Sequence, residues 1–206
     1  MVDVQLRARG IADERVLSAI LAVPRDQFVS PEQRRSAYAD DALPIASGQT
    51  ISQPYIVARM TELLRVGPGD RVLDIGTGSG YQAAILAAIG CEVVSIERHP
   101  SLADAARERL VRLGYGANVE VRVGDGSVGD AGGAPWRGIV VAAAAPRIPG
   151  ALREQLDPEG GRLVLPVGRR DHQSLIVVTR DGDTWTEVDD GPVMFVPLVG
   201  EEGFQS

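Results

Sequence analysis

Apolar and polar positions along the chain change their spacing near residue 70. Residues 1–23 carry apolar side chains at helical spacing, which predicts two short helices, the second beginning after Asp13. Residues 24–53 show no such period and are interrupted by prolines and glycines, so we expect an irregular loop. A loop of this length in a compact domain is more often functional than idle. We expect the next helix over Ile56–Leu64.

From Gly69 onward, short apolar runs alternate with helical patterns, which predicts a mostly parallel sheet with helices on both faces. The turn pairs Asp181-Gly182 and Asp190-Gly191 separate the last strands and predict an antiparallel C-terminal edge. The expected strands are Arg71–Ile75, Glu92–Ile96, Val119–Val123, Ile139–Ala143, Arg162–Pro166, Ser174–Arg180, Trp185–Asp189 and Val193–Pro197. The expected helices are Tyr81–Ile89, Ser101–Leu113 with Ser101 as its cap, and Pro149–Leu156.

Length and composition predict a single soluble domain. Its 206 residues are 44% hydrophobic and 24% charged, as in ordinary globular proteins, and the net charge of −7 argues against a general nucleic-acid binder. We find no leader pattern and no apolar run of membrane-spanning length, so we expect a cytoplasmic protein with no membrane partner. Cys91 is the only cysteine, which excludes an intramolecular disulfide, and its apolar neighbours favour a buried packing role.

The stretch Asp70–Gln82 combines an apolar strand, a glycine-rich turn and the start of a helix. Gly76, Gly78 and Gly80 allow the backbone to approach a ligand closely and to adopt conformations that a Cβ would forbid. Together these elements are typical of the first crossover of a nucleotide-binding fold, where the first N–H groups of the helix suit polar or anionic ligand groups. A glycine-rich turn without a ligand remains the alternative for this stretch taken alone.

Two acidic residues follow later strands. Glu97 lies at the end of the second predicted strand, where a carboxylate can bind both hydroxyls of a ribose; because Gly78–Ala83 matches GxGxxA, a nicotinamide enzyme also fits. Asp125 follows the third strand and can accept a hydrogen bond from an exocyclic amine such as that of adenine. The combination indicates a Rossmann-like, S-adenosylmethionine-dependent methyltransferase. A nicotinamide oxidoreductase and a ligand-binding protein without catalysis remain as alternatives.

Nearly the whole chain resembles the protein-L-isoaspartate O-methyltransferase family. The glycine loop is shared with methyltransferases generally, whereas Gly48–Pro54 and Phe195–Gly200 are distinctive for this family. The segments that carry the resemblance are Ala22–Val29, Leu43–Ile45, Gly48–Pro54, Arg71–Gln82, Val123–Gly126, Ala143–Pro146, Gly160–Gly168 and Phe195–Gly200.

The resemblance implies an enzyme that uses S-adenosyl-L-methionine to methylate the free carboxylate of L-isoaspartyl residues in damaged proteins and peptides. The methyl ester then closes to a succinimide, which hydrolyses partly to normal aspartate. The family assigns catalysis to the residue matching Ser52, and substrate binding to those matching Ser52, Val196, Pro197 and Leu198. The matching cofactor positions are Gln49, Thr50, Ile51, Ser52, Gly76, Thr77, Gly78, Ser79, Gly80, Glu97, Arg98, Asp125 and Gly126.

The resemblance also implies an organisation and a set of partners. We expect residues 1–53 to supply N-terminal helices and the active-site loop, 54–168 the cofactor-binding core, and 169–206 the C-terminal strands of one domain. Isoaspartyl-containing proteins and peptides are the expected partners, the enzyme acts as a monomer, and no metal is needed. A related methyltransferase that modifies an aspartate in one dedicated partner peptide is the alternative.

Elementary chemistry agrees with a serine at the active site. A carboxylate with a pKa of about 4 is already ionised at neutral pH, so it needs no strong general base. The Ser52 hydroxyl can orient that carboxylate by donating a hydrogen bond, although Ser52 could instead cap the helix beyond Pro54. His99 could line the adenosine pocket, but a surface-loop histidine is the favoured interpretation, and His172 receives no function.

The chain departs from the family pattern at two arginines. Arg137 and Arg147 stand where the family commonly has acidic residues. We expect both near one rim of the ligand crevice, where a reversed charge would bear on substrate preference and leave cofactor binding intact.

Overall fold

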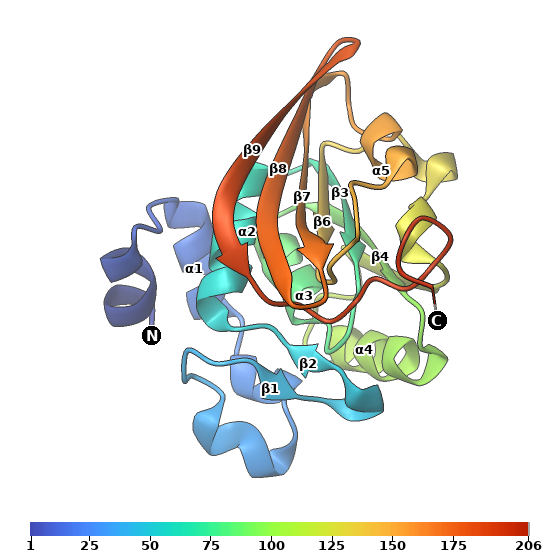
Figure 1. The fold of residues 1–206 in the computed structure, drawn as a ribbon. Helices are drawn as coiled ribbons and strands as arrows, with labels where there is room; N and C mark the ends of the chain where they lie inside the picture. Colours follow the sequence, from blue (N-terminus) through green and yellow to red (C-terminus); the bar gives the residue numbers. More distant parts are fainter. Residues whose placement is uncertain (206) are drawn as a thin grey trace.

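A seven-stranded sheet forms the centre of the protein; the computed structural model describes residues 1–205. Its strands are β3 (Arg71–Ile75), β4 (Glu92–Glu97), β5 (Val119–Val123), β6 (Gly138–Val141), β7 (Glu159–Arg169), β8 (His172–Asp181) and β9 (Thr184–Val193). They are arranged in the order β5-β4-β3-β6-β7-β8-β9 (Figure 1). Strands β3 to β7 run parallel, while β8 and β9 add antiparallel strands at one edge, which confirms the predicted fold class.

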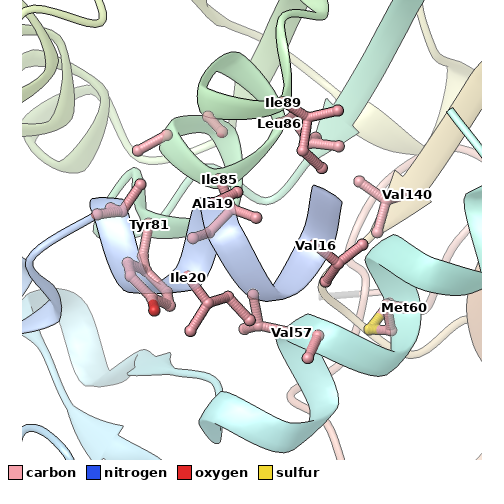
Figure 2. Close-up of a cluster of buried hydrophobic side chains, with 14 of the residues drawn as sticks. Val16, Ala19, Ile20, Val57, Met60, Tyr81, Ile85, Leu86, Ile89 and Val140 are labelled. Atoms are coloured by element: carbon pink, nitrogen blue, oxygen red, sulfur yellow. The ribbon is translucent and has the colours of Figure 1, made fainter. Parts of the chain in front are cut away.

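Helices cover both faces of this sheet. They are α1 (Glu14–Ala22), α2 (Pro54–Leu64), α3 (Tyr81–Ile89), α4 (Pro100–Arg112) and α5 (Gly150–Glu154). Buried side chains of α1 to α4 belong to one hydrophobic cluster, and those of α5 belong to a second. Figure 2 shows part of the first cluster, where side chains of α1, α2 and α3 converge. No helix among residues 1–205 is long and apolar enough to cross a membrane.

Alternating side chains of the central strands divide between the two clusters. Val72 packs in the cluster of α1 to α4, whereas its neighbours Leu73 and Ile75 pack in the cluster of α5. Val140 of β6 belongs to the first cluster and Ile139 to the second. Because successive side chains of a strand point to opposite faces, a strand covered on both faces is apolar throughout. This explains the short continuous apolar runs of the sequence.

The segment before the sheet is more ordered than its sequence predicts. Asp13 caps α1 as expected, because its Oδ1 accepts a hydrogen bond from the backbone N–H of Arg15 at 2.9 Å. The predicted irregular loop contains several short 3-10 turns and a small hairpin, in which β1 (Leu43–Pro44) pairs antiparallel with β2 (Thr50–Ile51). Strands of two residues carry too little periodicity to be recognised in a sequence.

Three details of the predicted elements are wrong. Helix α4 begins at Pro100, one residue before the expected cap Ser101, because proline has the dihedral angle of a first helical residue and lacks the N–H that would be left unpaired there. The expected turn at Asp190-Gly191 lies inside β9, where Gly191 has a φ of +117°. The chain then continues through Val193–Pro197 without the predicted separate strand; only Pro197 forms an isolated bridge.

Helix α2 is tied to distant parts of the chain by charged side chains. Arg59 donates to both carboxylate oxygens of Asp190 in β9 and, through Nη1, to Glu62 Oε2 at 3.0 Å. Glu62 Oε1 accepts from the backbone N–H groups of Ala12 and Asp13 at 2.7 and 2.9 Å. The hydrogen bond to Asp190 is the main cause of the raised pKa of Arg59. These contacts hold α2 between β9 and the start of α1.

Removing the partner of Arg59 in β9 is expected to weaken this arrangement. The Asp190→Ala variant should lower the free energy of unfolding by about 2 kcal/mol, because a bidentate, mostly buried, charged contact is lost. Denaturant titration measures the change. Asp104→Ala is the matched control, since Asp104 pairs with Arg107 but its side chain is 67% exposed, so its loss should cost under about 0.5 kcal/mol. Equal losses in the two variants would contradict the assignment.

Candidate functional site

A cavity opens where β3, β4 and β6 end, the place at which sheets of this kind bind nucleotide-like ligands. The loop before α2, the glycine loop and the segment after β9 all reach it. The predicted site residues that line it are Gln49, Thr50, Ile51, Ser52, Gly76, Thr77, Gly78, Ser79, Glu97, Arg98, Gly126, Val196, Pro197 and Leu198. The structure therefore brings together segments that lie far apart in the sequence.

The glycine loop turns sharply between β3 and α3. Gly76, Gly78 and Gly80 have φ values of +91°, +51° and +87°, a region that residues with a Cβ rarely adopt. Gly80 does not line the cavity and instead packs against α4, where an added Cβ would lie 3.4 Å from Leu110. Its role in this fold is to let the turn lie close to α4.

Glu97 joins the glycine loop to the end of β4. Its Oε2 accepts a hydrogen bond from the backbone N–H of Gly78 at 2.9 Å, and its Oε1 accepts one from the backbone N–H of His99 at 2.9 Å. The residue is only 4% exposed and lines the cavity. Each carboxylate oxygen has two lone pairs, so each keeps acceptor capacity for a ligand hydroxyl after these contacts.

The Asp125 carboxylate accepts hydrogen bonds from the protein itself. Asp125 is not among the residues lining the cavity, and its Oδ1 accepts from the backbone N–H and the hydroxyl of Ser127. Its Oδ2 accepts from the backbone N–H of Glu201 at 2.8 Å, so the carboxylate holds the C-terminal segment against the end of β5. Contact between Asp125 and an exocyclic amine stays a prediction. The next residue, Gly126, does line the cavity, and an added Cβ there would lie 2.4 Å from Ile75 Cγ2.

A chain of buried polar side chains lies beneath the glycine loop. Asp74 is fully buried; its Oδ2 accepts from the Ser95 hydroxyl at 2.6 Å, and its Oδ1 has no hydrogen-bond partner. Ser95 lies 2.6 Å from the hydroxyl of Thr77, which lines the cavity. Burial, and to a smaller extent the nearby charge of Glu97, raises the pKa of Asp74 to about 7. Asp74 therefore takes up a proton near neutral pH directly below the ligand loop.

A second cavity lies next to the first. The two share Thr50, Ser52, Ala142 and Val196 in their linings, so Ser52 is at the junction. Ser52 is not the cap of α2, which was its alternative role, because Gln53 occupies the N-cap position of that helix. A small ligand in the first cavity and a second reactant in the other would meet beside the Ser52 side chain.

Several lining residues were missed or assigned otherwise from the sequence. His99 lines the first cavity, whereas the favoured interpretation was a surface loop. The apolar lining had no separate signal, because its side chains follow the same periodicity as the core. The residues of the first cavity without a predicted site role are Val57, Met60, Ile75, Tyr81, Gln82, Ile96, Ala142, Ala143 and Val199.

Arg137 is not at the rim of the crevice, which corrects that expectation. Its backbone N–H donates a hydrogen bond to the carbonyl of Arg71 at the start of β3. This is the end of the strands opposite the cavity. The guanidinium of Arg137 instead donates a hydrogen bond to the backbone carbonyl of Glu159. Arg147 is exposed and lines neither cavity. Cys91 is buried, which raises the pKa of its thiol to about 12, so it packs in the core as predicted.

Comparison with known proteins places the chain in a family. Residues 1–203 match the family described as protein-L-isoaspartate(D-aspartate) O-methyltransferase (PCMT). The chain belongs to this family. The protein-L-isoaspartate O-methyltransferase of Methanoculleus marisnigri is 55% identical over 206 residues, which cover 100% of this chain and 92% of that protein. The protein of the same name from Koribacter versatilis is 52% identical over 206 residues, which cover 99% of this chain and 91% of that protein.

Solved structures agree with the family in fold. A protein-L-isoaspartate O-methyltransferase superposes with a TM-score of 0.85 at 27% identity and covers 98% of this chain and 67% of its own. A Plasmodium falciparum protein of the PCMT family, solved in complex with S-adenosyl-L-homocysteine, has a TM-score of 0.78 at 24% identity and covers 94% of each chain. The family and the Rossmann-like methyltransferase fold predicted from the sequence are thus confirmed. No cluster of His, Cys, Asp or Glu within residues 1–205 could hold a metal ion.

The raised pKa of Asp74 predicts a pH-dependent stability difference. Because the folded state binds this proton more tightly than the unfolded state does, its contribution is complete below pH 4 and is lost as the pH rises towards about 7. Asp74→Asn lacks this titration, so relative to the wild type it should gain stability between pH 4 and pH 8, by up to about 4 kcal/mol. Denaturant titration of both proteins without ligand measures the difference.

A matched control separates this effect from other titrations. Asp104→Asn changes an exposed carboxylate, and its stability should follow the wild type across the same pH range. If the Asp74→Asn and wild-type curves run parallel, Asp74 does not titrate in this range.

Proposed function

We propose that this protein transfers a methyl group from S-adenosyl-L-methionine to the free carboxylate of L-isoaspartyl residues in damaged proteins and peptides. Membership of the family supports the reaction, and the carrying observation is that Ser52 lies where the two cavities meet. One cavity suits the methyl donor and the other an acceptor peptide. The methyl ester would then close to a succinimide and start repair.

The residues of the first cavity fit the methyl donor. Glu97 keeps acceptor capacity for the two ribose hydroxyls, and the cavity offers apolar side chains such as Ile75 and Ile96 beside it. The glycine loop opens towards the first turn of α3, whose N–H groups suit a carboxylate. When bound, S-adenosyl-L-methionine supplies an activated methyl group on a sulfonium centre. We assign Gly76–Ser79, Glu97, Arg98 and Gly126 to this ligand, and Gly80 to the turn that shapes the loop.

The protein has little proton chemistry to perform on the acceptor. An isoaspartyl carboxylate is ionised at neutral pH, so it needs orientation and exclusion of water, not a general base. The Ser52 hydroxyl can donate a hydrogen bond to one carboxylate oxygen and direct the other towards the first cavity. We therefore assign Ser52 as the catalytic residue and place the neighbouring Gln49, Thr50 and Ile51 around the donor.

The segment after β9 lies at the border of the two cavities, because Val196 lines both and Pro197 and Leu198 line the first. The carbonyl of Val196 accepts from the N–H of Ala144 at 2.8 Å, and the N–H of Leu198 donates to the Ala144 carbonyl at 2.7 Å. These bonds hold Val196–Leu198 along the end of β6, between the donor cavity and the C-terminal segment. We assign Val196, Pro197 and Leu198 to substrate binding, because a fixed backbone costs little further ordering on binding.

The proposal extends to organisation and partners. We propose that residues 1–53, 54–168 and 169–206 act as loop, donor-binding core and acceptor-binding edge of one domain. Isoaspartyl proteins and peptides would be its partners, it would act as a monomer in the cytoplasm, and a net charge of −7 speaks against nucleic-acid substrates.

Two peptides that differ only in one linkage test the reaction. With methyl-labelled S-adenosyl-L-methionine, the isoaspartyl peptide should gain base-labile label, and its normal aspartyl twin should gain at least about a hundredfold less, because the free carboxylate is placed differently on the backbone. Equal labelling of the two peptides would sink the proposal. Labelling of neither peptide would also sink it and would favour a methyltransferase dedicated to one partner.

The role of Ser52 is tested by removing its hydroxyl. Ser52→Ala should lower kcat/KM for the isoaspartyl peptide about 10- to 100-fold, the value of one hydrogen bond to a charged group. Binding of S-adenosyl-L-homocysteine, measured by calorimetry, should change far less. Ser101→Ala is the control, because Ser101 is exposed on α4 and provides no cap. A Ser52→Ala enzyme with full activity would remove Ser52 from catalysis.

A further inference from the structure

The second cavity has a wall that the reaction itself does not explain. Its lining includes Arg9 from the N-terminal segment, Asp40 from the loop before β1, and Tyr55 from the first turn of α2. Met194 and Phe195, from the segment after β9, also line it. The cavity therefore extends from Ser52 to the guanidinium of Arg9, which comes from the N-terminal segment.

Arg9 is held in this wall by two kinds of contact. Its guanidinium carbon lies 3.4 Å from the centre of the Tyr55 ring, a stacked arrangement, and its Nη1 donates to Asp40 Oδ2 at 2.5 Å. Its side chain is nevertheless 46% exposed. Arg9 is thus oriented by the protein and remains accessible from the cavity.

Asp40 links Arg9 to the part of the chain that carries Ser52. Its Oδ1 accepts from the backbone N–H of Tyr55 at 3.0 Å, and its Oδ2 also accepts from the Gln53 side chain at 2.7 Å. Helix α2 has no side-chain cap of its own, so Asp40 satisfies one of its first N–H groups from a distant loop. Arg9, Tyr55 and the loop at Ser52 consequently share one fixed frame.

The free part of the guanidinium can bind a further acceptor. A guanidinium has five N–H groups, and within residues 1–205 the only hydrogen bond from the Arg9 side chain is the one to Asp40. The charge of Arg9 is already paired, and Asp41 adds a further carboxylate to the lining. An uncharged oxygen therefore suits this wall better than an acidic side chain does.

We propose that Arg9 is a substrate-binding residue that hydrogen-bonds to a main-chain carbonyl of the acceptor peptide beyond the two amide groups that flank the isoaspartyl residue. This inference rests on the proposed function. Damaged proteins share the altered residue and a peptide backbone but no side-chain sequence around it, so a contact to the backbone serves all of them. Arg9 would thereby hold the flanking chain while Ser52 orients the carboxylate.

The test crosses two Arg9 variants with three isoaspartyl acceptors. Arg9→Met keeps the length of the aliphatic stem, and Arg9→Lys keeps the charge without the planar group. One acceptor is an isoaspartyl residue blocked at both ends by the smallest acyl and amide groups. The second carries several alanines on each side, and the third carries glutamates in their place. Steady-state methylation gives kcat and KM for each combination.

For the alanine-flanked peptide, Arg9→Met should raise KM about tenfold and change kcat less than twofold, because a contact made equally in ground and transition states is lost. For the blocked single residue, kcat/KM should stay within twofold of the wild type. Arg9→Lys should give an intermediate KM. The ratio of kcat/KM for the alanine-flanked peptide to kcat/KM for the glutamate-flanked peptide should be the same in each variant as in the wild type.

Arg7→Met is the matched control. Arg7 is two residues away, its side chain is 43% exposed, it pairs with Glu14, and it lines neither cavity. It should behave as the wild type with every acceptor. The KM for S-adenosyl-L-methionine should be unchanged in all three variants, which a general disturbance of the fold would not allow.

Three results would overturn the inference. Equal loss with the blocked residue and the long peptide would mean that Arg9 acts by supporting the site and not by touching the flanking chain. Selective loss with the glutamate-flanked peptide would mean that it binds acidic side chains. Unchanged KM in both Arg9 variants would mean no contact at all. Failure of the proposed function is recognised separately, since wild-type enzyme would then fail to prefer the isoaspartyl over the aspartyl peptide.

Discussion

Parallel pairing of β3 with β4 on one side and with β6 on the other is the constraint on which the site depends. The register aligns Ile75 with Ile96 and Val141, so the three strands end together. Loops that follow parallel strands must therefore open at one edge of the sheet. Glu97, at the end of β4, accepts a hydrogen bond from the backbone N–H of Gly78, which fixes the glycine loop relative to β4. A cavity at this edge is a consequence of the topology.

The start of α2 is the second point where distant parts of the chain meet. The N-cap residue Gln53 provides no side-chain cap, and the missing acceptor comes from Asp40, in a loop that precedes the helix. Farther along the same helix, Arg59 and Glu62 connect β9 with the segment before α1. The helix that follows Ser52 is thereby fixed at both ends. This fixes the position of the two cavities relative to each other. These contacts are the physical reason why the two cavities form one unit.

Local signals predicted most of the elements and failed where two local preferences competed. Asp13 had no competitor and caps α1 as expected. Ser101 was a plausible cap, but Pro100 before it already fits the first helical position, and the helix starts there. The pair Asp190-Gly191 has the composition of a turn, yet pairing with β8 continues past it and the Asp190 carboxylate meets Arg59. Partners far away in the sequence decided that case.

The sequence by itself determined the fold class, the glycine loop and most of the polar residues that line the first cavity, because their patterns follow helix, strand and motif spacing. Its resemblance to a family also indicated Ser52 and the segment after β9. Only the tertiary structure decided that Asp125 holds the C-terminal segment, that Arg137 lies at the end of the sheet opposite the first cavity, and that Arg9 lines the second cavity. The direction of a polar side chain depends on the partners that folding brings within hydrogen-bond distance, and no local pattern encodes them.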